Sequence, residues 1–314
     1  MNFPYKGMLL DTVKGSIATL ALFIAFISLP LAGILPGLFA PLPGMYYTLK
    51  SGKGVGLAIV LITAGLLAII AEPMAMPLFL AQAGLISLAL PHFLAKGWGG
   101  AQAVAFSAAV GCAFTLLIAA TLWLGQGVDP HREILNGINS SISQTAALYE
   151  KSGMKGEDLQ ALQQGMKQVG AVIGRIYPAL VLTGLGAIAG LNLLALGRMA
   201  VRLNRPLAVG DLRKFRNPDH LIWFVIVAGF ALLLNNSAIT TAALNVLVVT
   251  LSLYFLQGLA IILFLFDRFA VHRFVRVTFY ILMALQPYLA VAVAALGIFD
   301  LWGNFRVPKQ QENL

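Results

Sequence analysis

The side chains best suited to chemistry in this chain are amides that lie within long apolar stretches. Five of them are our candidates: Asn192, Asn245, Gln257, Gln286 and Gln82. Inside a bilayer an amide must face protein or water, because lipid offers it no hydrogen-bond partner. These amides could therefore line a polar pocket that holds a small ligand. Alternatively, they could hydrogen-bond neighbouring helices to each other, at about 0.6 kcal/mol each.

One acid, Glu72, lies between two apolar stretches and precedes Pro73. It could bind a cation or relay a proton, or it could belong to a turn at the membrane surface. No ladder of acidic residues runs through the apolar stretches, so the sequence gives little support to a proton-driven pump.

Signatures of enzymes and of metal sites are missing from the sequence. Cys112 is the only cysteine, and the four histidines are far apart: His92, His131, His220 and His272. A zinc site needs such ligands at close, regular spacing. The glycine-rich segment 52–56 lacks the Gly-Lys-Ser/Thr ending of a phosphate-binding loop, and no Gly-x-Ser-x-Gly elbow occurs. We therefore expect no catalytic residue, no metal and no cofactor, in a protein that is not an enzyme.

The elements that carry the amides are apolar runs long enough to cross a bilayer. The chain is 59% hydrophobic and only 11% charged, whereas a soluble domain carries about 25% charged residues. A helix of roughly 20 residues spans the hydrocarbon layer. The clearest runs of that length are residues 54–71, 100–124, 178–197, 239–266 and 277–299. We therefore predict an all-α polytopic transmembrane helical bundle.

Positive charge predicts which loops stay in the cytoplasm. Lysines and arginines gather in short loops around residues 50–53, 96, 198–216 and 268–276. This placement indicates membrane topology and attraction to anionic lipid. The net charge of +9 is therefore no sign of nucleic acid binding.

The number of membrane segments depends on residues 15–47. If they cross twice, Lys6 and Lys14 lie in the cytoplasm with the N-terminus, and the bundle has nine segments. Prolines 30, 36, 41 and 43 break the second pass, so residues 30–47 could instead be re-entrant, which gives eight. The C-terminus is expected outside in both cases.

Residues 127–172 form the only long polar connection, which the flanking segments place outside. Asp129 can cap a helix that has Pro130 at its first position, and Gly153 can end that helix. A second helix begins near Glu157 and leads into the next apolar run. Apolar residues at helical spacing on both helices predict an extramembrane helical hairpin. It could be a lid, a surface for a partner, or two helices that cover each other.

Three motifs in the C-terminal third carry a resemblance to a known family. Residues 215–223 read Phe-Arg-Asn-Pro-Asp-His-Leu-Ile-Trp, residues 257–260 read Gln-Gly-Leu-Ala, and residues 297–306 read Gly-Ile-Phe-Asp-Leu-Trp-Gly-Asn-Phe-Arg. With the turn near residues 42–52, this pattern resembles the YybS-like bacterial membrane proteins, which carry the domain of unknown function 2232. The resemblance marks these signature residues: Arg216, Pro218, Asp219, Trp223, Asp300, Trp302 and Arg306.

The signature residues also have ordinary physical roles. Trp223 suits the headgroup level of a membrane, and Arg216 could pair with Asp219. Asp300 and Arg306 could form an ion pair, and with Trp302 they are expected at the opposite interface.

The resemblance implies that the protein lies in the inner membrane of a bacterium. It also implies a division of the chain. The N-terminal half of the family resembles the substrate-binding subunits of energy-coupling-factor transporters and the rod-shape protein MreD, which share a six-helix bundle. Residues 1–200 would form such a six-segment bundle with the hairpin inserted. Residues 201–314 would add three C-terminal helices.

Two functions are open on this basis. The protein could bind a small molecule and pass it across the membrane, or it could be a scaffold that organises other membrane proteins. Amides that converge on an enclosed cavity would favour transport, and amides that pair helix to helix would favour the scaffold. Expected partners are the lipid bilayer, other membrane proteins and, for a transporter, an unidentified small molecule, but no nucleic acid.

Overall fold

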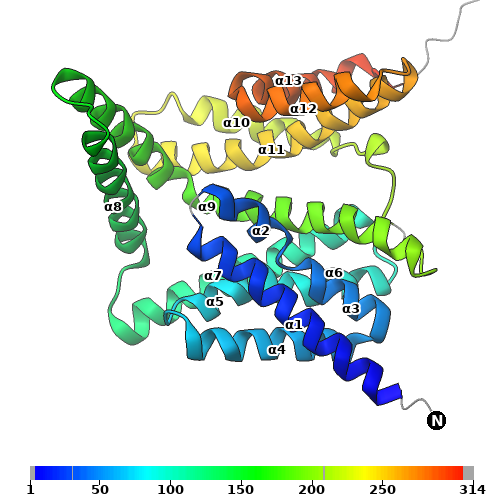
Figure 1. Cartoon of the computed structure of the whole chain (residues 1–314). Helices are drawn as coiled ribbons and strands as arrows, with labels where there is room; N and C mark the ends of the chain where they lie inside the picture. Colours follow the sequence, from blue (N-terminus) through cyan, green and yellow to red (C-terminus); the bar gives the residue numbers. More distant parts are fainter. Residues whose placement is uncertain (1–3, 30, 208, 307–314) are drawn as a thin grey trace, which may run out of the picture. The chain divides into compact units, whose positions relative to one another are not determined.

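The computed structural model describes residues 4–29, 31–207 and 209–306, and every regular element within these ranges is a helix (Figure 1). This confirms the predicted all-α class. The chain divides into two compact units. The N-terminal unit comprises the residues up to Ser141 together with Val181–Gly210. The C-terminal unit comprises Ile142–Leu180 together with the residues from Asp211 onward.

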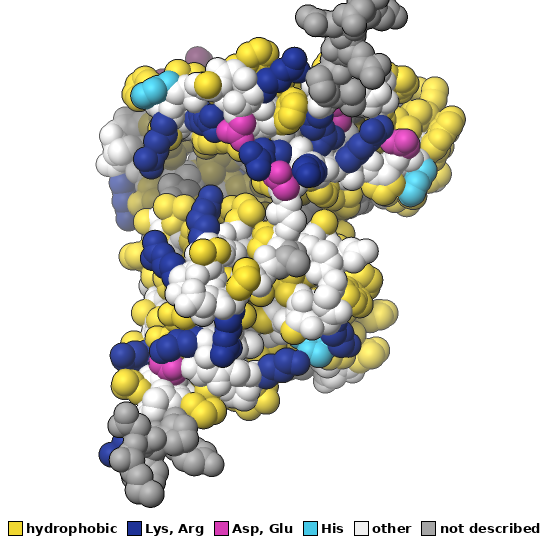
Figure 2. Space-filling view, turned by 90° about the vertical axis from the view of Figure 1, so that its right-hand side faces the viewer, with side chains coloured by type: hydrophobic (Ala, Val, Ile, Leu, Met, Phe, Trp, Pro, Cys, Tyr) yellow, Lys and Arg dark blue, Asp and Glu magenta, His cyan; other side chains and the backbone are white. Residues whose placement is uncertain are grey.

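Large apolar side chains are exposed on the outside of the helices, where a water-soluble protein would carry charge. Leu124 is 80% exposed, and Phe230 and Val291 are each 68% exposed. The space-filling view shows many hydrophobic side chains on the surface, with Lys and Arg gathered on the face in view (Figure 2). Helices that face lipid acyl chains are expected to expose such apolar surface.

The first helix of the N-terminal unit is followed by a broken segment, as its prolines predict. After α1 (Pro4–Ser28) come a 3-10 turn (Leu31–Gly33), α2 (Ile34–Phe39) and α3 (Leu42–Ser51). None of these three pieces is long enough to cross the hydrocarbon layer alone.

An ion pair fixes the direction of this segment. Lys50, near the end of α3, lies 2.7 Å from the carboxylate of Asp11 in α1, measured from Nζ to Oδ1. The chain therefore runs along α1, reverses direction, and brings the end of α3 back beside the N-terminal half of α1. The alternative in which residues 15–47 cross twice requires this return, because it places Lys14 on the same side as Lys50 and Lys53.

The remaining helices of this unit are longer. α4 covers Lys53–Ile70, and α7 covers Gly100–Gln126. Between them, α5 (Ala75–Phe79), a π-helical turn (Leu80–Gly84) and α6 (Leu85–Ala95) follow one another without a break.

The hairpin begins and ends as its capping residues predict. α8 covers Pro130–Lys151. The carboxylate of Asp129 accepts a hydrogen bond of 2.9 Å from the backbone N–H of His131, which is a helix N-cap. Gly153 follows α8 with a φ of +102°, a left-handed conformation that glycine adopts without strain.

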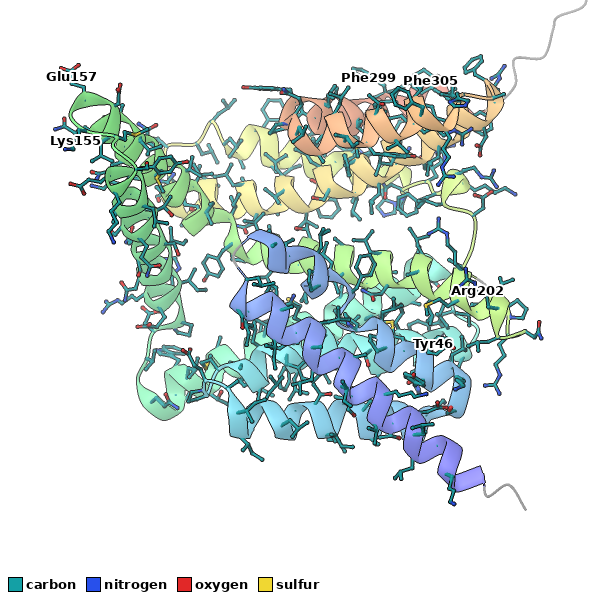
Figure 3. All side chains as sticks on the ribbon, viewed as in Figure 1. Tyr46, Lys155, Glu157, Arg202, Phe299 and Phe305 are labelled. Carbon is teal, nitrogen blue, oxygen red and sulfur yellow. The ribbon has the colours of Figure 1, made fainter. Side chains whose placement is uncertain are left out.

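The second helix of the hairpin and the apolar segment after it are one helix. α9 runs from Glu157 to Arg202, a length of 46 residues. Lys155 lies in the turn before it, and Arg202 lies at its far end (Figure 3).

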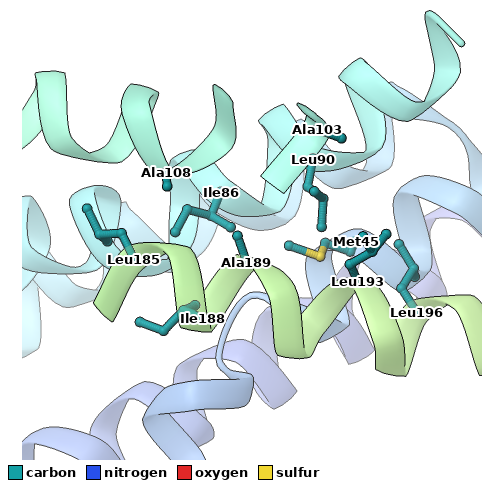
Figure 4. Close-up of a cluster of buried hydrophobic side chains, with 10 residues drawn as sticks. All are labelled: Met45, Ile86, Leu90, Ala103, Ala108, Leu185, Ile188, Ala189, Leu193 and Leu196. Atoms are coloured by element: carbon teal, nitrogen blue, oxygen red, sulfur yellow. The ribbon is translucent and has the colours of Figure 1, made fainter. Parts of the chain in front are cut away.

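The N-terminal unit is built around a core of buried apolar side chains from α3, α6, α7 and the last part of α9 (Figure 4). Three of its ten residues are alanines, whose small side chains let the helices approach closely. The core residues are Met45, Ile86, Leu90, Ala103, Ala108, Leu185, Ile188, Ala189, Leu193 and Leu196.

The basic loops of the N-terminal unit lie at one end of it. The guanidinium of Arg205 donates a hydrogen bond to the carbonyl oxygen of Leu49. The carbonyl oxygen of Val209 lies so close to Gly100 that any side chain there would collide with it. The loops near residues 50, 97 and 205 thus share one end, as the distribution of positive charge predicts.

The C-terminal unit contains four further helices. They are α10 (Ile222–Ala231), α11 (Ser237–Arg268), α12 (Arg273–Leu285) and α13 (Pro287–Gly303). The amide oxygen of Asn236 caps α11 by accepting hydrogen bonds from two backbone N–H groups of its first turn.

The predicted count of nine membrane segments, or eight, is not confirmed. Six helices among the described residues are long and apolar enough to cross a bilayer. α10 has only 10 residues, or about 15 Å of helix. α12 and α13 are bent from each other by 109°, and a seventh segment requires counting both as one. The predicted run 277–299 is thus two helices, because Pro287 has no N–H to continue the hydrogen-bond ladder.

Candidate functional site

Three of the five amides, Asn192, Asn245 and Gln257, form hydrogen bonds between helices. The side-chain nitrogen of Asn192 in α9 donates to the carbonyl oxygen of Leu38 in α2 at 2.7 Å. Asn245 in α11 accepts a hydrogen bond of 2.9 Å from the backbone N–H of Ala179 in α9, and it donates to the carbonyl oxygen of Arg175 at 2.7 Å. The first bond lies in the N-terminal unit and the second in the C-terminal unit.

The other predicted ligand-binding residues lie on different elements. Gln286 is exposed at the bend between α12 and α13. Gln82 is half-buried in the π-helical turn of the N-terminal unit. Glu72 is exposed, and its carbonyl accepts a hydrogen bond from the N–H of Ala75, so it belongs to the turn between α4 and α5. That these side chains, with Asn192 and Asn245, bind a ligand stays a prediction.

The fifth amide, Gln257, belongs to a buried polar network where α11 packs against α13. The two backbones touch at Gly258 and Gly297. A Cβ at Gly258 would collide with the carbonyl oxygen of Val293, and one at Gly297 would collide with that of Tyr254. Only glycine permits this approach, which brings the polar side chains of both helices within hydrogen-bond distance.

Asp300 of α13 lies at the centre of the network and is only 2% exposed. Its Oδ2 accepts hydrogen bonds from Gln257 at 3.0 Å and from the guanidinium of Arg306 at 2.6 Å. Its Oδ1 accepts a bond from the backbone N–H of Phe305 at 3.1 Å. A buried carboxylate needs such partners, since desolvation without them costs several kcal/mol. The predicted Asp300–Arg306 ion pair is confirmed.

Arg306 and Gln257 also hold the basic segment 211–217 against the ends of α11 and α13. Arg306 donates to the carbonyl oxygens of Arg213 and Phe215 at 3.0 and 2.7 Å. The amide oxygen of Gln257 accepts a hydrogen bond of 2.9 Å from the backbone N–H of Asn217, which is itself buried. One network thus joins residues from all three signature motifs.

This arrangement corrects the expected position of the last signature motif. Asp300, Trp302 and Arg306 were expected at the interface opposite the basic loops. Asp300 and Arg306 instead contact the basic segment 211–217 directly. The bend at Gln286 and Pro287 returns the chain to the end at which α11 finishes. The expectation that the C-terminus lies outside assumed a crossing by 277–299, and this geometry removes that basis.

The remaining signature residues lie near the same segment. Arg216 pairs with Asp219 at 3.2 Å, as predicted. Pro218 precedes the 3-10 turn (Asp219–Leu221) that leads into α10. Trp223 in the first turn of α10 is 64% exposed, and Trp302 near the end of α13 is 69% exposed. Such exposed tryptophans suit the headgroup level of a bilayer.

Ion pairs link the basic segment to the next basic loop. Arg213 lies 2.8 Å from Asp211 and 2.8 Å from Asp267 at the end of α11, and Asp267 lies 2.6 Å from Arg276 in α12. The hydrogen bond from Arg213 lowers the pKa of the Asp211 carboxyl below its ordinary value. Acidic and basic side chains are interleaved on this face in Figure 2.

A pocket of about 570 Å³ opens at this end of the C-terminal unit. Basic residues outnumber acidic ones in its lining, so an anion is the ligand it suits best. Among the residues that the structure describes, no three His, Cys, Asp or Glu side chains gather closely enough to hold a metal ion. The lining residues are Asp211, Arg213, Lys214, Arg216, Phe264, Asp267, Arg268, Asp300, Asn304 and Arg306.

The sequence contains only partial signals for this pocket. Lys214 and Arg268 lie in basic loops that predict topology, and Asn217 lies in the first signature motif with no predicted role. Their signal lay in the repetition of basic residues in two loops far apart in sequence. Nothing in the sequence showed that the bend at Pro287 would bring Asp300 and Arg306 to those loops.

Comparison with known protein families confirms the family resemblance that the motifs indicate. Residues 17–301 match the family described as "Predicted membrane protein", which is defined by the domain of unknown function 2232. Neither the curated proteins nor the solved structures include one that matches the chain. The matched region contains Asp300, the two close-packed glycines and the basic segment. The chain therefore belongs to the family of predicted membrane proteins that carry the domain of unknown function 2232.

Proposed function

We propose that this protein is a scaffold of the bacterial inner membrane that holds other membrane proteins, and that it transports no solute through its bundle. One observation carries the proposal: Asn192, Asn245 and Gln257 each form a hydrogen bond to another helix, as expected for side chains that join a packed bundle. The transport alternative required a shared polar cavity within the apolar segments. The resemblance of the N-terminal half to MreD is compatible with this scaffold role.

The exposed apolar faces supply the surface that a membrane scaffold needs. On α10, Val227 is 64% exposed and Phe230 is 68% exposed. Helix association within lipid depends on close packing and on a few hydrogen bonds, since apolar residues gain little by leaving acyl chains. A partner helix could therefore pack on such a face without any polar site.

Photo-crosslinking in native membranes tests this proposal. A photoreactive phenylalanine analogue at Phe230 should form a reproducible crosslink to one or a few membrane proteins. The matched control is the same analogue at Phe23, which is fully buried and should crosslink only within the chain. Small molecules that co-purify with the full chain are measured by mass spectrometry in parallel. A recurrent small molecule, with no protein crosslink at Phe230, would contradict the scaffold and favour transport.

A further inference from the structure

The charged pocket of the C-terminal unit has more cations than its own carboxylates can pair. Five basic and three acidic residues line it. All three acids are engaged: Asp211 with Arg213, Asp267 with Arg213 and Arg276, and Asp300 with Arg306. The three acids therefore neutralise only the cations with which they pair, and no unpaired carboxylate among the described residues lines the pocket for the other cations.

Two lining cations, Lys214 and Arg268, form no ion pair in the described part of the chain. Lys214 acts on Asp211 only through longer-range attraction, and the guanidinium of Arg268 lies 5.8 Å from the centre of the Phe269 ring. A third, Arg216, is only weakly held, at 3.2 Å from Asp219 and 3.5 Å from Asn304. These three groups can turn toward a ligand without breaking a short ion pair.

The wall of the pocket that carries these cations is fixed in place. Arg306 binds the carbonyl oxygens of Arg213 and Phe215, on both sides of Lys214. Arg268 ends α11, which is anchored to α13 through Gln257 and Asp300. Because the backbone is held before a ligand arrives, little ordering entropy opposes binding.

We propose that this pocket binds a phosphate group, with Lys214, Arg216 and Arg268 as the residues that contact it. Arginine and lysine are the side chains that proteins use for phosphate oxygens. The pocket lies at the end of the apolar helix α11 and includes Phe264, so it can receive a phosphate from an anionic lipid headgroup or from a soluble phosphate compound.

Binding measurements on the purified full chain distinguish the two sources. After removal of co-purified lipid, native mass spectrometry measures retention of phosphatidylglycerol against phosphatidylcholine, and calorimetry measures the affinity for inorganic pyrophosphate. Preferential retention of phosphatidylglycerol alone identifies a lipid site. Binding of pyrophosphate alone identifies a site for soluble phosphate. Binding of neither probe overturns the proposal.

A double variant tests the residues. In the variant Lys214→Gln with Arg268→Gln, we expect the affinity for the bound probe to fall by roughly 25-fold, about fivefold for each charge removed. The matched control is Lys151→Gln with Lys167→Gln, which removes two exposed cations of the hairpin. An equal loss in the control would mean that net charge alone attracts the probe. That result, or an unchanged double variant, would also overturn the proposal.

Discussion

Asp300 is the residue on which the buried hydrogen bonds of the C-terminal unit converge. It accepts three of them while 2% exposed, and one donor is a guanidinium. Its role is to position Arg306, which in turn holds the basic segment 211–217. A buried ion pair adds little net stability, because the cost of removing both charges from water offsets their attraction. The loss of one member is costly, because it leaves the other charge buried without a partner.

Replacement of Asp300 should therefore be costly. We expect Asp300→Ala to lower the free energy of unfolding by about 3 kcal/mol, because Arg306 and Gln257 lose their shared acceptor. Unfolding of the purified protein with a denaturing detergent measures this change. The matched control is Asp219→Ala, whose side chain is 75% exposed and whose loss should change stability by about 0–1 kcal/mol. Equal changes in the free energy of unfolding for the two substitutions would show that the buried network stabilises the protein no more than an exposed ion pair.

Acid should weaken the contact between Asp211 and Arg213. The pKa of Asp211 is lowered from its ordinary value of 3.8 by the hydrogen bond from Arg213. Its contribution to stability is therefore complete above that value and is lost as the pH falls through the lower pKa of the folded state. We expect Asp211→Asn to melt at a lower temperature than the wild type near about pH 6, and the difference to disappear near about pH 2 to 3. A difference that persists in acid would assign the effect to packing.

At the scale of helices, two features shape the C-terminal unit: the close crossing of α11 and α13, and the bend between α12 and α13. The crossing depends on Gly258 and Gly297, whose missing side chains let the backbones touch. The bend depends on Pro287. Together they place the signature motif of residues 297–306 beside the motif of residues 215–223.

A single methyl group at the crossing should separate the two helices. We expect Gly258→Ala to destabilise the protein by about 1–3 kcal/mol, since the added Cβ would collide with a backbone oxygen that cannot move aside. Gly229→Ala is the control, because nothing lies within 4 Å of that added Cβ on α10. Thermal unfolding in detergent compares the two variants. A neutral Gly258→Ala would show that α11 and α13 are not in contact there.

The bend can be tested by labelling of single cysteines in intact cells and in inverted vesicles. With Cys112→Ala as background, we expect Phe269→Cys and Asn304→Cys to react with an impermeant thiol reagent from the same side of the membrane. This follows because Asp267, near one site, and Arg306, near the other, both contact Arg213 or its backbone. Labelling from opposite sides would restore residues 277–299 as a crossing segment.

The helices and their caps could be predicted from the sequence because their causes are local. Asp129 caps α8, Gly153 follows it, and prolines break residues 31–51, all within a few residues of the sequence signal. The pairing of Asp300 with Arg306 was also predictable, since they are separated by six positions. The pocket was not, because it depends on the angle at Pro287 and on contacts between residues about 90 positions apart. The amides of Asn192 and Asn245 show the same limit, since apolar runs do not show which carbonyl a buried amide will meet.

At the scale of the whole molecule, the two units have separate sources of stability. The N-terminal unit is held by apolar packing around Leu90 and its neighbours. In the C-terminal unit, the glycine crossing and the polar network around Asp300 join α11 to α13. A destabilising substitution in one unit should therefore lower the stability of that unit more than that of the other.

Hydrogen exchange of a core variant tests this separation. We expect Leu90→Ala to cost about 2–5 kcal/mol, because it leaves a cavity in a fully buried site. Exchange should become faster in α3, α6 and α7, while the backbone amides of α11 and α13 keep their wild-type protection. Mass spectrometry of the exchanged peptides reports both. Uniformly faster exchange along the chain would show that the two units unfold as one.

The bonds from Arg306 to the carbonyl groups of Arg213 and Phe215 also impose an order on biosynthesis. Arg306 is made 93 residues after Arg213, so at about 5–20 residues per second the ribosome needs roughly 5–20 s to reach it. During that delay, segment 211–217 is already translated, but Arg306, which binds its carbonyl groups, is not. The arginines and lysine of this segment can therefore contact the membrane surface before Asp300 and Arg306 are available to hold the segment.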